Sequence, residues 1–179
     1  MRGEFWKFRM AAQFHELGYF QRFDPKARYL LWASAIESIY TSSHRNHKTA
    51  LVAKSRIKWF LEENTPIYAP GDLPQLLADP HITIGDIVGD VYEIRNIIAH
   101  GDKLPDRLDA PRRNEFCNDR VSIYQVLFDA ASFIIRTSLL KILRDNLLDH
   151  FANENAANAY FGAQGLTLPK IAAAIAAQP

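Results

Sequence analysis

The 179-residue sequence has a single cysteine, almost no net charge and no long uninterrupted apolar run. Cys117 alone cannot form an intrachain disulfide or a cysteine-based zinc cluster, which fits a reducing, cytoplasmic compartment. The formal net charge of +1 gives the whole chain no electrostatic preference for nucleic acid or membrane, so any anion binding must be local. No run approaches the roughly twenty apolar residues of a membrane-spanning helix, and we expect neither a membrane segment nor a signal peptide.

What the chain does have is apolar content suited to one buried core. Hydrophobic residues make up 48% of the chain and aromatic residues 12%, which favours a single domain. Apolar positions recur at helical intervals, and no alternation is long enough to predict a strand. The sequence therefore predicts an all-α bundle of about four main helices. We expect these helices over residues 25–40, 47–63, 83–101 and 118–151, the last being a long C-terminal helix.

Short capping signals predict where two of these helices begin and where one ends. Asp24 can cap free backbone N–H groups in front of Pro25, and proline at the first helical position loses no hydrogen bond. Thr83 and Asp86 resemble a capping box in which Asp replaces the usual Glu or Gln. Gly101 is a natural helix stop.

The chain is expected to have three parts: an N-terminal arm (1–24), a helical domain (25–151) and a C-terminal extension (152–179). The arm holds seven aromatic residues without a clear period, which predicts an irregular or short-helical segment packed on its own domain or on another subunit. Prolines and a glycine predict a loop over 65–80. The extension, rich in Asn and Ala, is expected to form one more short helix.

The feature that most clearly indicates a functional site is an arginine inside the apolar stripe of the predicted helix 83–101. At about 100° per residue, Arg95 falls in line with apolar residues of that helix: Ile84, Val88, Val91 and Ile98. A guanidinium cannot shed its charge, so on a packed face it needs a carboxylate or an anion from outside. It can pair with Glu37, and breaking such a buried pair costs roughly 3–5 kcal/mol. It can also hold a phosphate at a cleft or subunit seam, and the two interpretations are compatible.

Asn96 and His100 extend this polar group toward the helix end. They are four residues apart and share a helix face, whereas Arg95 and His100 lie about 140° apart in a straight helix. One chain can bring these two together only if the helix unwinds near Ala99. Otherwise a second copy of the helix must supply the missing partner. The motif is therefore interpreted as half of a site.

Taken together, these residues resemble the HEPN superfamily, and within it the Apea-like branch, whose hallmark is Arg, a polar residue and a later His. Here the hallmark is Arg95, Asn96 and His100, followed by Gly101. The resemblance spans roughly residues 25–151 and extends to residues outside the motif: Glu37, His47, Lys48, Ala53 and Arg56. It implies a HEPN-like helical bundle that often forms a homodimer, with the two motifs facing each other.

Many members of this superfamily are metal-independent endoribonucleases, and the resemblance implies the same activity here. It implies a role as a toxin or antiviral-defence effector, for which an antitoxin or another partner protein is expected. The implied reaction is attack of a ribose 2′-hydroxyl on the adjacent phosphate, which leaves a 2′,3′-cyclic phosphate and a 5′-hydroxyl end. His100 is then the general base or acid, Arg95 holds the charge on the phosphate oxygens, and Asn96 orients the histidine or the phosphate. Glu37 supports Arg95. No cofactor or metal is expected.

A basic turn before the second predicted helix is a candidate RNA contact, through Arg45, His47 and Lys48. His44 and His47 lack an adjacent Asp, Glu or Cys that would complete a metal ligand set. Two other functions stay open. One is a non-catalytic HEPN-like module for dimerisation or for nucleotide or RNA binding, and the other is a helical assembly protein that matches the motif by chance. The near-neutral charge argues against an enzyme that grips long RNA.

Overall fold

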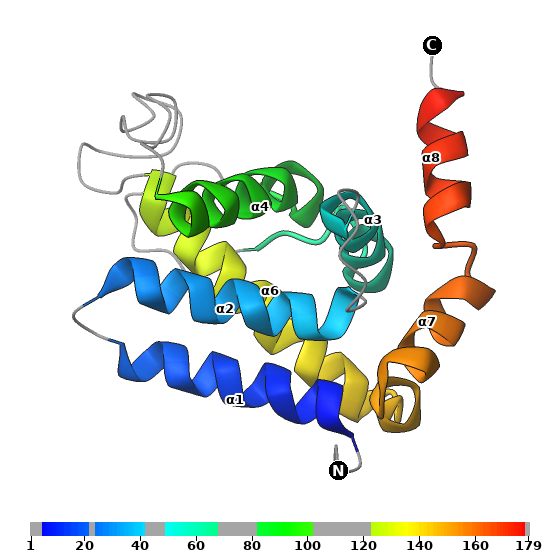
Figure 1. The fold of residues 1–179 in the computed structure, drawn as a ribbon, viewed down its shortest axis with the longest axis horizontal. Helices are drawn as coiled ribbons and strands as arrows, with labels where there is room; N and C mark the ends of the chain where they lie inside the picture. Colours follow the sequence, from blue (N-terminus) through cyan, green and yellow to red (C-terminus); the bar gives the residue numbers. More distant parts are fainter. Residues whose placement is uncertain (1–4, 22–23, 42–48, 68–81, 102–122, 178–179) are drawn as a thin grey trace.

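The computed structural model describes residues 5–21, 24–41, 49–67, 82–101 and 123–177, and they are mostly helical (Figure 1). The predicted all-α class is confirmed. None of the described helices is both long and apolar enough to cross a membrane. The elements are α1 (Trp6–Phe20), α2 (Pro25–Tyr40), α3 (Thr49–Leu61), α4 (Ile84–His100), α6 (Ile123–Arg144), the 3-10 helix η1 (Leu148–Phe151), α7 (Glu154–Ala163) and α8 (Leu168–Ala176).

The predicted caps are present in the structure. The Asp24 carboxylate accepts a hydrogen bond of 2.9 Å from the backbone N–H of Ala27, and Pro25 opens α2. At α4, Thr83 and Asp86 form both hydrogen bonds of a capping box. Gly101 ends α4 with a φ of 73°, in the left-handed region that favours glycine. These local hydrogen bonds set the position and length of α4, which carries the motif.

The N-terminal segment is more regular than the irregular or short-helical segment that the sequence predicts. It forms a regular 15-residue helix, α1, which lies along α2 in the same chain (Figure 1). Gly18 permits this close approach, because a Cβ there would collide with the indole of Trp32. The Trp32 Nε1 donates to the His15 carbonyl at 3.1 Å. The pattern was obscured because Tyr19 and Phe20 are exposed while Phe8 and Phe14 pack against the core, so α1 shows little helical periodicity.

The C-terminal region also differs from the prediction. The long helix ends at Arg144 rather than near 151, and Asn146 follows with a φ of 55°. The start predicted at 118 lies outside the described residues. Beyond η1 there are two helices, α7 and α8, where one was expected. Phe151 and Phe161 are fully buried, so the extension through α7 belongs to the core because its aromatic side chains fill space beside α3.

The core lies where α6 crosses behind α1, α2 and α4 (Figure 1). Two buried tyrosine hydroxyls of α2 have hydrogen-bond partners in this core, as is usual for buried polar groups. The Tyr29 hydroxyl donates to the Val91 carbonyl of α4 at 2.9 Å, and the Tyr40 hydroxyl lies 2.6 Å from that of Ser138 on α6. These bonds fix α2 against α4 and α6, and so fix the two helices that carry Glu37 and Arg95.

A buried lysine joins α1 to the end of α2. Lys7 is 3% exposed, and its ammonium donates to the carbonyls of Ser38 and Thr41, both at 2.7 Å. These carbonyls are among those that a helix C-terminus leaves without a backbone partner. Burial lowers the pKa of Lys7 from 10.5 to about 8; Glu154 opposes this shift and Arg56 adds to it.

This lowered pKa predicts a pH-dependent stability. Between about pH 8 and 10.5 the unfolded chain binds the Lys7 proton and the folded chain does not, so the Lys7 contribution to the free energy of unfolding rises with pH. Relative to Lys7→Met, the wild type should gain up to about 3 kcal/mol across this window. Urea denaturation over that range measures the difference. The exposed Lys26→Met is the control and should show no such slope, and parallel curves for Lys7→Met and wild type would contradict the prediction.

Candidate functional site

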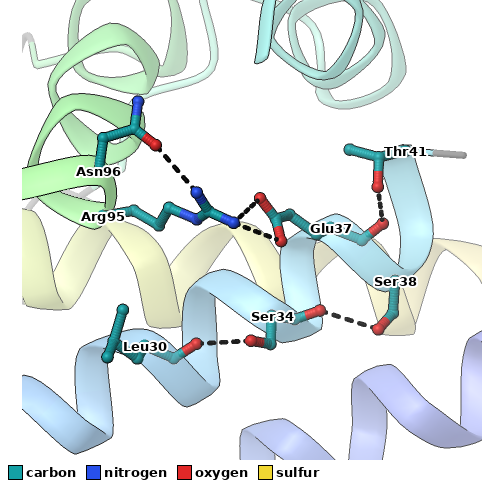
Figure 2. A network of polar contacts seen from close by, with 7 residues as sticks. All are labelled: Leu30, Ser34, Glu37, Ser38, Thr41, Arg95 and Asn96. Atoms are coloured by element: carbon teal, nitrogen blue, oxygen red, sulfur yellow. Dashed lines mark hydrogen bonds and ion pairs between the residues drawn. The ribbon is translucent and has the colours of Figure 1, made fainter. Parts of the chain in front are cut away.

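The predicted partners Arg95 and Glu37 meet between α4 and α2 (Figure 2). The Arg95 Nη2 lies 2.9 Å from Glu37 Oε1 and 3.2 Å from Oε2. The Arg95 Nη1 donates to Asn96 Oδ1 at 3.0 Å. Two sides of the guanidinium are thus held, one by a carboxylate and one by an amide oxygen. Glu37 and Asn96 together orient Arg95, a stronger constraint than either bond alone.

Hydroxyl side chains bond back onto α2 around Glu37. Ser34 donates to the Leu30 carbonyl at 2.8 Å, Ser38 donates to that of Ser34 at 2.8 Å, and Thr41 donates to that of Glu37 at 2.7 Å (Figure 2). Their hydrogen-bonding capacity is therefore directed at the backbone of their own helix. The carboxylate of Glu37 remains the charged group that α2 presents to Arg95.

The ion pair sits at the rim of the packed face and not deep within it. The side chains of Arg95 and Glu37 are 33% and 27% exposed. The sequence-based expectation of a buried arginine is wrong in this respect, because the apolar stripe of α4 is fully covered only as far as Ile94. Ile98 is partly buried, and Ala99 is exposed. A pair this accessible is screened by water, so we expect it to contribute about 1 kcal/mol rather than the larger value for a buried pair.

His100 completes the last turn of α4 and is exposed, as is Asn96. The helix continues without unwinding to His100, and Gly101 then ends it. Within the described part of the chain, His100 forms no hydrogen bond with Arg95 or Asn96. Of the two predicted ways to bring Arg95 and His100 together, helix unwinding is therefore absent. The structure joins Arg95, Asn96 and Glu37, and leaves His100 apart in the same chain.

One residue beside this group was not singled out from the sequence. Tyr92 is 4% exposed, and its hydroxyl has no hydrogen-bond partner among the residues that the structure describes. Its pKa is raised, first by burial and then by the Glu37 carboxylate, while the Arg95 guanidinium lowers it. Its position three residues before Arg95, on the same face of the predicted helix, was the available signal.

The expected RNA contacts Arg45, His47 and Lys48 lie outside the described residues. Among the residues that the structure does describe, no group of three or more His, Cys, Asp or Glu side chains could hold a metal ion. The fold and site define an all-helical bundle with a charge-paired arginine, an amide and an exposed imidazole near the end of one helix. No family model, curated protein or solved structure matches the chain.

Proposed function

We propose that this protein is a metal-independent endoribonuclease of the HEPN type whose active site is composite, formed across a homodimer. The observation that carries this proposal is that the Arg95 side chain is both held in place and accessible to solvent. Its guanidinium is held by Glu37 and Asn96 and is still one-third exposed, and it precedes the exposed His100 by little more than one helical turn. An oriented and accessible guanidinium is suited to a phosphate, because its fork matches the phosphate oxygens.

The proposed chemistry needs a proton acceptor, a proton donor and a group that stabilises negative charge. The ribose 2′-oxygen forms a bond to phosphorus while the bond from phosphorus to the 5′-oxygen breaks. The 2′-hydroxyl loses its proton to a base, and the leaving 5′-oxygen gains one from an acid. His100 acts in one of these two roles, since an imidazole ring has nitrogens that can accept or donate a proton. Arg95 stabilises the charge on the phosphate oxygens, and Asn96 holds Arg95 in place.

Two copies of the chain are required because α4 is regular through His100. In a straight helix Arg95 and His100 point about 140° apart, so one phosphate does not meet both side chains of one chain. A second α4 packed against the first can supply the missing member. Ala99 and His100 at the end of α4 are exposed and can take part in such a contact. A role as a toxin or defence effector would follow from RNA cutting of this kind.

The second candidate is a non-catalytic module of the same type that dimerises or binds nucleotides or RNA. The observation that favours it is the pairing of Arg95 within the chain. Glu37 and Asn96 already satisfy part of the guanidinium, so the arginine has a structural role whether or not a phosphate binds. In this case the protein would assemble or bind RNA, and it would leave the RNA intact.

Purified protein should cut RNA in the presence of EDTA and leave 2′,3′-cyclic phosphate and 5′-hydroxyl ends. Both Arg95→Ala and His100→Ala should reduce the cutting rate by about 100-fold or more, because each removes a group acting in the transition state. The matched controls are the exposed Arg136→Ala on α6 and His150→Ala in η1. RNA cutting that persists in either Arg95→Ala or His100→Ala would contradict the proposal. Binding of RNA without cutting by the wild type favours the non-catalytic module.

A further inference from the structure

Within the described part of the chain, the Tyr92 hydroxyl lacks a hydrogen bond although it is buried beside the charged site. Leaving a buried hydroxyl without a partner costs free energy, and native structures rarely do so. By contrast, the hydroxyls of Tyr29 and Tyr40 in the same core are both bonded. An orphaned hydroxyl at this place indicates a partner that it meets in another state of the site.

The position of Tyr92 narrows the choice of partner. Tyr92 and Arg95 are three residues apart on α4 and therefore neighbours on one face of the helix. Both charges of the ion pair act on the hydroxyl, Glu37 in one direction and Arg95 in the other. At 4% exposure, Tyr92 is closed to a nucleic acid, so its partner must come from within the protein. Glu37 is the hydrogen-bond acceptor in this network that carries a charge, and its side chain is still 27% exposed.

A phosphate that binds Arg95 creates the need for such a partner. The phosphate and the Glu37 carboxylate are both anions, and they compete for the same guanidinium. A carboxylate displaced without a new partner would oppose phosphate binding. A hydroxyl that donates to a carboxylate forms a charge-assisted hydrogen bond, which is stronger than a neutral one.

We propose that Tyr92 is a positioning residue that receives the Glu37 carboxylate when a phosphate of RNA takes its place on Arg95. This inference rests on the proposed function, since it requires Arg95 to bind RNA phosphate. The described structure is then the closed state, with Arg95 on Glu37 and the Tyr92 hydroxyl unused. In the open state Glu37 accepts from Tyr92 and the guanidinium faces the phosphate.

The decisive variant is Tyr92→Phe, which keeps the ring and removes only the hydroxyl. It should be at least as stable as wild type in urea denaturation, because it deletes an unpaired polar atom. The probe is a short RNA with a 2′-O-methyl group at every position, which cannot be cut. Tyr92→Phe should bind this RNA about tenfold more weakly, since the displaced carboxylate has lost its donor. Tyr19→Phe is the matched control: it removes a hydroxyl that lies 2.9 Å from that of Ser132, between α1 and α6, and it should bind RNA as wild type does.

A double variant tests whether Tyr92 acts through Glu37. In a Glu37→Gln background there is no carboxylate to receive, so adding Tyr92→Phe should not change RNA binding further. Equal RNA binding by wild type and Tyr92→Phe overturns the inference. The inference is also overturned if Tyr92→Phe weakens RNA binding in the Glu37→Gln background as much as it does in the wild type. The proposed function fails separately: a wild type that binds the methylated RNA with the expected dependence on Tyr92, and leaves ordinary RNA uncut, is not a nuclease. A wild type that binds no RNA overturns both.

Discussion

Mixing Arg95→Ala chains with His100→Ala chains is expected to restore RNA cutting to about a quarter of the wild-type rate, although each variant alone is inactive. Random pairing makes about half of the dimers mixed. In a mixed dimer one composite site lacks both groups, whereas the other takes Arg95 from one copy and His100 from the other. The measurement is cutting of a labelled RNA after the two variants have been unfolded together and refolded.

The control for this experiment replaces the His100→Ala chain with a chain that carries both substitutions. No site in that mixture contains both groups, so cutting should stay absent. An active site contained within one chain also predicts no recovery from the two single variants. Failure to recover activity would therefore show that the site is not shared between copies, even if the wild type cuts RNA.

Arg56→Ala is expected to lower the free energy of unfolding by about 3–5 kcal/mol. Arg56 is 5% exposed and donates to the carbonyl of Tyr40 at 3.0 Å, to Asn158 Oδ1 at 3.0 Å and to the carbonyl of Leu166 at 3.3 Å. Its guanidinium also lies 4.8 Å from the ring centre of Phe161. Alanine leaves a cavity and three acceptors without their donor, and urea denaturation measures the loss.

The contacts of Arg56 run from α3 to the end of α2 and to α7 and the segment after it. The variant should therefore also expose the C-terminal extension to limited proteolysis before the rest of the chain unfolds. Arg56→Lys should recover little, because one ammonium does not span the acceptors that a guanidinium reaches. The exposed Arg9→Ala should stay within about 0.5 kcal/mol of wild type. A similarly small change for Arg56→Ala would mean that these hydrogen bonds contribute little.

The bounds of α4 could be predicted because their causes are local. The Thr83 and Asp86 capping box joins residues three apart, and Gly101 needs only its own backbone angle. The pairing of Arg95 with Glu37 was also within reach, since a charge on an apolar stripe needs a partner and Glu37 was the acid in a facing apolar run. These inferences depend on local hydrogen bonds and on the cost of leaving a charge unpaired, both of which follow from residue type.

The extent of the core could not be predicted in the same way. The α1 helix was missed because its apolar side chains lie on more than one face, and its pairing with α2 depends on Gly18 lying against Trp32. The α7 helix looked polar in sequence, yet Phe161 fills the space beside Phe60 of α3. Such contacts join residues far apart in the chain, so no local pattern reveals them.

The sequence by itself determined the all-α class, the caps of α2 and α4 and the identity of the charged pair, because hydrogen bonds between near neighbours and the burial of charge follow from residue type. Only the tertiary structure decided how deep each group lies. It left Arg95 and Glu37 about one-third exposed at a rim and kept His100 on a regular helix. It also buried the Tyr92 hydroxyl without a hydrogen-bond partner in the described ranges of the chain. Depth depends on which helices pack together, and packing is a property of the whole chain.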